Sequence, residues 1–140
     1  MKRIMIGVFF LVGLIGCQSQ LTYSEVEMTK ANASVQEFME FVKHENGPYL
    51  YLDGKKTMYL FLNGGNVVQG EKAIHFTDVK VKAENDTLNL FVTEDETDDY
   101  SNDSLTHQAL YKIHDNHIYE TIHLFVNGTE TPFTMINGNE

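Results

Sequence analysis

Hydrophobic residues recur in this chain first with the period of a helix and then with the shorter alternation of strands. Four apolar residues follow the helical spacing i, i+3, i+4 and i+7, namely Val35, Phe38, Met39 and Val42. Ser34, with Glu37 three residues later, has the form of a capping box at the start of this helix. Because a glycine followed by a proline ends a helix, we expect one amphipathic helix that stops within residues 46–48.

The chain after Pro48 is rich in Tyr, Phe, Val, Ile and Thr and is interrupted by short polar or glycine-containing segments, which is typical of strands and turns. The pattern predicts eight strands: Tyr49–Leu52, Thr57–Leu62, Asn66–Gln69, Ala73–Ala83, Thr87–Thr93, Leu105–His114, His117–Val126 and Thr129–Met135. The segment Met58–Leu62 is apolar at every position, so we expect it to be covered on both faces, with the helix as one cover.

The short connections between these segments favour an antiparallel meander, because consecutive hairpins place neighbours in sequence beside each other in space. Closure of the meander protects its edges and leaves an interior for side chains or one small ligand. We therefore predict an all-β domain, an eight-stranded antiparallel up-and-down barrel with one N-terminal helix. If Asn66–Gln69 does not form a strand, an open sheet or a small β-sandwich is the alternative.

A second kind of apolar segment lies at the N-terminus, from Ile4 to Gly16, behind the basic residues Lys2 and Arg3. It is shorter than the ~20 residues that a helix needs to cross a bilayer core. A basic tip followed by a short apolar run is instead typical of a secretory signal, so we predict that residues 1–16 are an export signal.

The end of this run, Leu14-Ile15-Gly16-Cys17, resembles a bacterial lipobox. The resemblance implies cleavage before Cys17, lipidation of its sulfur and a mature chain held by that lipid on the outer face of the cell membrane. An ordinary signal that leaves a free cysteine is the alternative. Residues 17–31 are polar and without apolar periodicity, so we expect a flexible lipidated tether, followed by a single β-rich domain over residues 32–140.

The charge of the chain narrows the range of partners. Without residues 1–16, the chain has 124 residues with 8 basic and 20 acidic side chains, a net charge near −12. Such a charge repels nucleic acid and anionic surfaces over a screening length of ~8–10 Å, so we expect no nucleic-acid partner. An acidic surface that simply keeps the domain soluble explains the same composition.

A helix before an eight-strand meander, on a small lipid-anchored chain, resembles the short lipocalin-like lipoproteins of Gram-positive bacteria, the YxeF type. This resemblance covers roughly residues 32–136. The order of a helix followed by strands also resembles PrcB-type β domains, in which a helix precedes a small sandwich.

An acidic segment, residues 94–103, carries six carboxylates, the oxygen ligands that Ca²⁺ prefers. Asp95, Asp98 and Asp99 are the candidate metal ligands, although the glycine and the closing glutamate of an EF-hand are absent. A solvated loop between two strands is the alternative. His114 and His117 flank a predicted turn, and no cysteine other than Cys17 could complete a zinc site, so we expect no zinc centre.

Catalytic motifs are missing from the sequence. It has no Gly-x-Ser-x-Gly elbow and no glycine-rich phosphate loop before a helix, and its one cysteine is assigned to the lipid. We therefore expect neither an enzyme nor a cofactor. Tyrosines can hold a ligand through both ring and hydroxyl, and Tyr51, Tyr59 and Tyr111 are the candidates to line a cavity.

These expectations lead to a binding protein outside the cytoplasm, attached to the membrane by its N-terminal lipid, with a small, partly apolar ligand inside the barrel. The alternative is a protein-interaction or inhibitory domain of the cell envelope without a small-molecule ligand. It would use exposed strand edges or the acidic segment.

Overall fold

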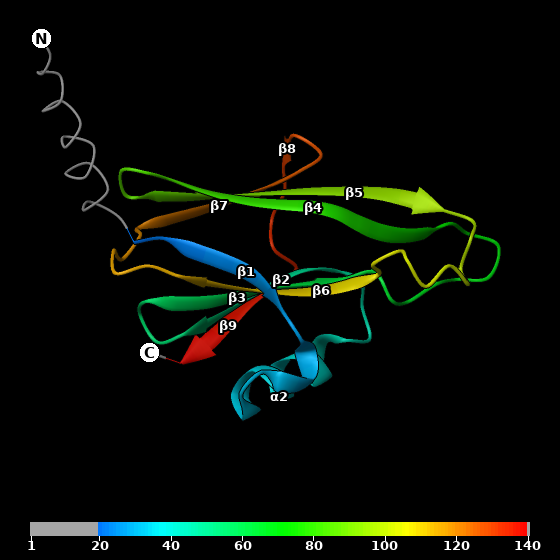
Figure 1. The fold of residues 1–140 in the computed structure, drawn as a ribbon, viewed down its shortest axis with the longest axis horizontal. Helices are drawn as coiled ribbons and strands as arrows, with labels where there is room; N and C mark the ends of the chain where they lie inside the picture. The colour runs from blue at the N-terminus through cyan, green and yellow to red at the C-terminus, as the bar shows by residue number, and fades with distance from the viewer. Residues whose placement is uncertain (1–19, 140) are drawn as a thin grey trace, which may run out of the picture.

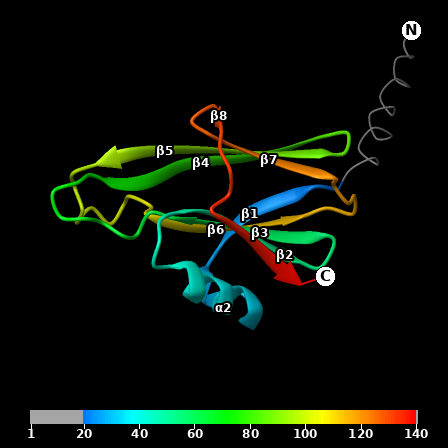
Figure 2. The same ribbon diagram turned by 180° about the vertical axis from the view of Figure 1, so that it is seen from behind.

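Two stacked β-sheets and one α-helix form the fold of residues 20–139, the part of the chain that the computed structural model describes (Figure 1 and Figure 2). The five-stranded sheet has the order β1 (Thr22–Val26), β6 (Gln108–His114), β3 (Thr57–Asn63), β2 (Gly47–Asp53) and β9 (Met135–Asn139). The four-stranded sheet has the order β4 (Ala73–Glu84), β5 (Thr87–Thr97), β7 (Thr121–Val126) and β8 (Thr129–Glu130). A short 3-10 helix, η2 (Met28–Lys30), precedes helix α2 (Ala33–Val42).

The main core lies between the two sheets. Its fully buried aliphatic residues include Leu50, Leu60, Leu88, Leu90 and Leu124, drawn from both sheets. These side chains alternate along their strands with residues that face outward, as the two-residue period of a strand requires. Burial of each large aliphatic side chain contributes about 1.5–3 kcal/mol, so this layer holds the sheets together.

Helix α2 covers the outer face of the five-stranded sheet, below the sheet in Figure 1. The four predicted apolar positions, Val35, Phe38, Met39 and Val42, are all buried, which confirms the predicted helix face. Phe38 packs against the rings of Tyr49 and Tyr51, with ring centroids 6.2 and 5.2 Å apart. β3 therefore has the helix on one side and the second sheet on the other, as the apolar segment Met58–Leu62 predicted.

The predicted capping box is wrong. Helix α2 begins two residues earlier, and the N-cap is Asn32, whose Oδ1 accepts a hydrogen bond from the backbone N–H of Val35 at 3.0 Å. Asn32 also donates from Nδ2 to Asp53 Oδ2 at 3.0 Å, so its side chain already has a partner in the sheet. This tertiary contact gives Asn32 an advantage over Ser34 that local sequence does not contain.

The all-β class is confirmed, but the eight-stranded up-and-down barrel is not what the described residues form. They form two sheets without a closed barrel, the arrangement of a sandwich. Asn66–Gln69 is a loop, and over this loop the chain crosses from one sheet to the other. β2 pairs with β9 and β5 pairs with β7 in parallel, and a simple antiparallel meander contains neither pairing. Three further parts of predicted strands lie in loops, namely residues 105–107, 117–120 and 131–134.

The predicted flexible tether is partly wrong, because Thr22–Val26 forms β1, which pairs along its whole length with β6. The domain thus begins near residue 20 and not near residue 32. Among the described residues, no helix is long and apolar enough to cross a membrane.

Candidate functional site

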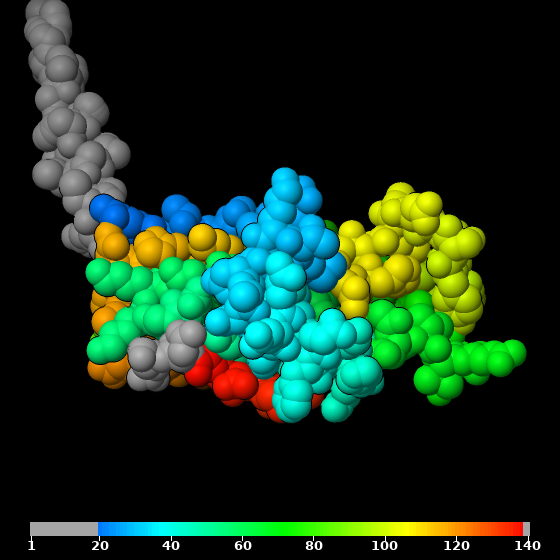
Figure 3. Space-filling model, turned by 90° about the horizontal axis from the view of Figure 1, so that it is seen from below, coloured from blue at the N-terminus to red at the C-terminus, as the bar shows by residue number. Residues whose placement is uncertain are grey.

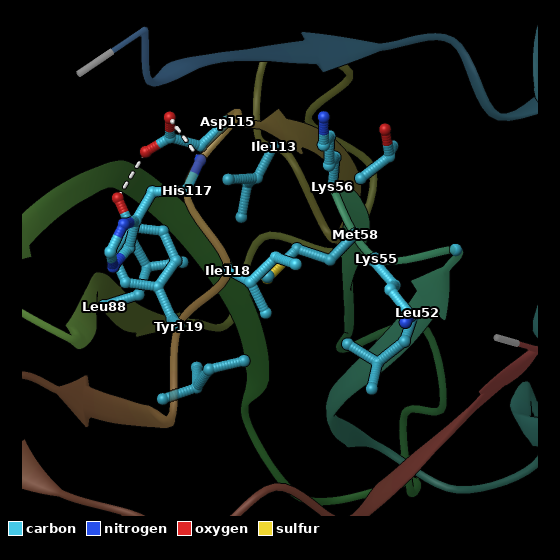
Figure 4. Close-up of a pocket in the computed structure, with 13 residues that line it drawn as sticks. Leu52, Lys55, Lys56, Met58, Leu88, Ile113, Asp115, His117, Ile118 and Tyr119 are labelled. Carbon is cyan, nitrogen blue, oxygen red and sulfur yellow. Dashed lines mark hydrogen bonds between the residues drawn. The ribbon is translucent and has the colours of Figure 1, made fainter. Parts of the chain in front are cut away.

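A cleft of about 270 Å³ opens between the two sheets at the end of the sandwich where the described chain begins, and we name it the proximal cleft (Figure 4). Its apolar walls come from both sheets and from the loop between β6 and β7, and they consist of Leu52, Met58, Leu88, Ile113, Ile118 and Ile122. No hydrogen-bond ladder joins the two sheets in the described residues, and the loop after β6 leads from the five-stranded sheet to β7 of the four-stranded sheet beside the cleft.

Asp115 is the buried polar residue of the proximal cleft, with only 4 % of its surface exposed. Its Oδ1 accepts hydrogen bonds from the backbone N–H groups of Gln20, at 3.3 Å, and His117, at 3.2 Å. Its Oδ2 accepts a hydrogen bond from the hydroxyl of Tyr119, as Figure 4 shows. Burial alone would raise the pKa of this carboxyl, but the hydrogen bonds from Tyr119 and from backbone amides outweigh burial and lower the pKa.

Asp115 thereby joins three segments that are distant in sequence. Its own backbone N–H donates to the carbonyl of Lys56 in the β2–β3 turn at 3.0 Å. Its carboxylate holds the N-terminal segment through Gln20 and the β6–β7 loop through Tyr119. Local sequence marked Asp115 only as a turn residue, a role in which aspartate is common.

Two lysines border the proximal cleft from the turn between β2 and β3. Lys55 and Lys56 are both exposed, and neither forms an ion pair with a carboxylate among residues 20–139. On the opposite border, the ring of His117 lies edge-on to Tyr119, with centroids 4.7 Å apart, and its Nε2 contacts Asp86 Oδ1 at 3.0 Å. The two borders of the mouth therefore differ in charge, with Lys55 and Lys56 on one border and the carboxylate of Asp86 beside His117 on the other.

A second cleft, which we name the distal cleft, has a volume of about 370 Å³ and lies at the opposite end of the inter-sheet space. Its walls include Leu62, Phe76 and Val92, and Glu94 borders it. Burial raises the pKa of the Glu94 carboxyl, and the neighbouring charge of Glu96 raises it further. Glu94 is also the first residue of the acidic segment 94–103, so this end carries carboxylates where the proximal cleft has its lysine border.

The three predicted ligand-binding tyrosines do not come together. Tyr51 and Tyr59 are direct cross-strand neighbours on the face that helix α2 covers, where both are buried. Tyr111 packs against the core on the other side of the same sheet. Adjacent positions on a strand face opposite sides, so the result depends on register, which the sequence did not specify. None of these three tyrosines lines the proximal cleft or the distal cleft.

The three candidate calcium ligands also lie apart. Asp95 is on β5, opposite His75, whereas Asp98 Oδ2 forms an ion pair with Lys72 Nζ at 3.2 Å. Asp99 Oδ1 accepts a hydrogen bond from Ser101 Oγ at 3.3 Å. Within the part of the chain that the structure describes, no group of three His, Cys, Asp or Glu side chains is placed to hold a metal ion. Metal binding by the acidic segment stays a prediction.

Cys17 lies outside the described residues, so its lipidation also stays a prediction. No protein-family model, curated protein or solved structure matches this chain. The resemblances to a lipobox and to YxeF-type lipoproteins therefore rest on the sequence alone.

Proposed function

We propose that this chain is a binding protein outside the cytoplasm, anchored to the membrane through lipid on Cys17, which holds a small, partly apolar ligand in the proximal cleft. The proposal has no catalytic step. The observation that carries it is the chemistry of the cleft: aliphatic walls from two sheets, with a few polar groups at fixed positions. This combination is typical of small-molecule sites, in which apolar contact supplies affinity and polar groups set orientation.

The buried carboxylate supports a preorganised site. Asp115 is held by Tyr119 and by backbone amides before any ligand arrives, so its position does not have to be established on binding. The floor residues Leu88 and Ile113 are almost fully buried in the core and are equally constrained. Preorganised walls reduce the entropy that binding costs.

The test measures what the full-length chain carries after purification from bacterial membranes. Organic extraction and mass spectrometry should find a small molecule in proportion to protein. Ile122→Phe fills part of the cleft and should reduce the amount bound, whereas Ile136→Phe places the same added ring on the half-exposed strand β9 and should not. If Ile122→Phe does not fold, Leu52→Phe blocks the opposite wall. A chain that carries nothing, or equal amounts in all variants, would refute the proposal.

A second candidate, an interaction domain of the cell envelope, is favoured by one observation at the other end. Val67 and Val68 are 43 % and 59 % exposed, and Tyr100 is 49 % exposed. The hydroxyl of Tyr100 donates to the carbonyl of Glu71, which ties the two loops of this end together. Chemical cross-linking in intact cells should then give a specific adduct that Val67→Ser with Val68→Ser abolishes and Ile122→Phe leaves unchanged.

A further inference from the structure

The proximal cleft lies next to the place where the chain leaves for its predicted anchor. The backbone N–H of Gln20 donates to Asp115, which borders the cleft, and the side chain of Gln20 accepts a hydrogen bond from Asn116. Three residue steps separate Gln20 from Cys17, and a fully extended chain covers about 10–11 Å in that distance. Lipid on Cys17 would therefore hold this end of the sandwich at the bilayer surface.

An apolar path runs from the mouth of the cleft to its floor. Ile118, in the β6–β7 loop, borders the cleft and is 55 % exposed, so it is apolar surface at the outer edge. Behind it, Ile113 is 1 % exposed and Leu88 is fully buried. Figure 4 shows Ile118 between the Asp115 side and the lysine side of the cleft. An acyl chain that enters past Ile118 can therefore contact a continuous set of aliphatic side chains, with the polar lining of the cleft, such as Thr57 and Asp115, beside it.

The volume of the cleft limits its ligand to part of a chain. At about 270 Å³ it is smaller than the ~300–1,000 Å³ of sites that enclose a whole drug-sized ligand. A ligand that inserts only one acyl chain, and leaves the rest outside, fits this size. A neighbouring bilayer would supply apolar surroundings for the remainder.

The lysines at the mouth favour an anionic head group on their own border of the cleft. Lys55 and Lys56 have no carboxylate partner in residues 20–139. The carboxylates of Asp115 and Asp86 lie toward the opposite border, where Tyr119 and backbone amides donate to Asp115 and His117 contacts Asp86. The acidic segment begins at Glu94, seven residues along β5 from Thr87, which corresponds to about 23 Å. Because this distance is nearly three times the ~8 Å screening length, repulsion between the distal carboxylates and an anion at the proximal mouth is largely screened. Figure 3 shows that end projecting away from the start of β1.

We infer that the proximal cleft faces the bilayer and takes the acyl chain of a single-chain lipid with an anionic head group, which Lys55 and Lys56 hold. This inference rests on the proposed function, because it names the ligand class of the same cleft. A fatty acid is the simplest member of the class. The head group stays at the lysine border while the chain passes Ile118 toward Leu88.

Photolabelling tests the ligand class with the full-length lipidated chain in phosphatidylcholine vesicles. The probe is palmitic acid with a diazirine near the chain end, and its matched control is a monoacylglycerol with the same chain and a neutral head. Peptide mass spectrometry should place the palmitic acid label on residues that border the proximal cleft. Lys55→Glu with Lys56→Glu should reduce this labelling about tenfold, as expected from reversing two charges near the head group.

The control variant is Lys80→Glu with Lys82→Glu, an identical charge change on exposed lysines of β4, on the outer face of the second sheet. It should leave labelling unchanged. If the neutral probe labels the cleft equally well, and Lys55→Glu with Lys56→Glu does not reduce that labelling, the inference of an anionic head group is wrong. The proposed function would still stand. Absence of cleft labelling by either probe would overturn both.

The orientation toward the bilayer has its own test, because the chain contains no tryptophan. Ile118→Trp places a single fluorophore at the proximal mouth, and Tyr100→Trp places one at the opposite end. In vesicles with brominated phospholipids, fluorescence of the lipidated Ile118→Trp chain should be quenched strongly, and that of Tyr100→Trp should not. Equal quenching, or stronger quenching of Tyr100→Trp, contradicts the inferred orientation.

Discussion

Replacement of Asp115 by alanine tests whether one carboxylate joins the N-terminal segment to the proximal cleft. In the folded protein this carboxylate accepts hydrogen bonds from the backbone amides of Gln20 and His117 and from the hydroxyl of Tyr119. Asp115→Ala leaves these donors without their acceptor. The N-terminal segment and the β6–β7 loop should both lose their attachment to this end of the sandwich.

The expected loss of stability depends on how many hydrogen bonds are lost and on whether water can reach the donors. A hydrogen bond to a charged group contributes ~1.5–3 kcal/mol, so three independent bonds would sum to about 4.5–9 kcal/mol. Gln20 and His117 are exposed, and water can reach their amides once the carboxylate is gone. We therefore expect Asp115→Ala to lower the free energy of unfolding by about 2–4 kcal/mol, and Asp115→Asn, which keeps one oxygen acceptor, by about half of that.

The pH dependence of stability shows how much of the contribution of Asp115 comes from its negative charge, because Asp115→Asn keeps the size of the side chain and removes the charge. Burial raises its pKa, but hydrogen bonds to the ionised form outweigh burial and lower the pKa below that of an unfolded aspartate, about 3.9. A lowered folded-state pKa stabilises the fold above pH ~3.9, and this contribution disappears as the pH falls through the folded-state pKa. The free-energy difference between wild type and Asp115→Asn should therefore be full at pH 7 and should shrink in strong acid.

Urea unfolding followed by circular dichroism at a series of pH values measures this difference. Tyr119→Phe, alone and combined with Asp115→Asn, isolates the hydroxyl–carboxylate bond, and we expect a coupling energy of about 1 kcal/mol or more. The reasoning is wrong if Asp115→Ala costs less than about 0.5 kcal/mol, the range of ordinary surface substitutions. It is also wrong if the difference between wild type and Asp115→Asn is the same at pH 7 and in strong acid.

Four further changes have defined outcomes. Phe38→Ala removes a buried ring from helix α2 and should cost about 3–5 kcal/mol in urea unfolding; a cost under about 1 kcal/mol contradicts the packing of the helix on the sheet. Gly64→Ala would place a Cβ 2.9 Å from the carbonyl oxygen of Ile74, so thermal unfolding should show a loss of about 1–3 kcal/mol. Cys17→Ser should move the chain out of the membrane fraction on immunoblots, and retention there contradicts lipid anchoring. Glu94→Gln should raise stability at pH 7 and lose that advantage in acid, because burial raises the folded-state pKa of Glu94 and the ionised form costs stability as the pH rises.

The sequence alone predicted those elements in which each face is either wholly buried or wholly exposed. The apolar positions of helix α2 share one helical face, and that face is buried as predicted. Met58–Leu62 has no polar position, and β3 is covered on both sides. In both elements the spacing of apolar residues along the chain depends only on which side chains are buried, so it can be read from the local sequence.

Pairing between distant strands could not be predicted in the same way. The parallel partners of β2 and β5 are β9 and β7, and nothing in the local pattern of a strand states which strand it will pair with. β1 escaped detection for a different reason. It is an edge strand, most of its side chains are exposed, and it therefore lacks the apolar alternation that identifies a strand.

The candidate site depended on the same long-range contacts. Asp115 and Tyr119 both belong to a connection between strands, and their importance comes from Gln20, which is 95 residues from Asp115 in the sequence. The tyrosines predicted to line a cavity were chosen for their chemistry, but register placed Tyr51 and Tyr59 under helix α2. Residue type indicated which groups can bind a ligand, and only the topology determined which of them meet.

The separation of the strands into two sheets also determines how a ligand could reach the interior. A closed barrel would enclose its ligand, whereas two sheets leave openings at both ends of the inter-sheet space, one at the proximal and one at the distal cleft. The distal opening lies beside Glu94 and the acidic segment, so an anionic membrane surface would repel it. The proximal opening has Lys55, Lys56 and the exposed Ile118 instead, and it is the end from which the chain leads to Cys17. Reversing the molecule on the proposed lipid anchor would place the carboxylates of the acidic segment against the lipid, so charge and chain connectivity favour the same orientation.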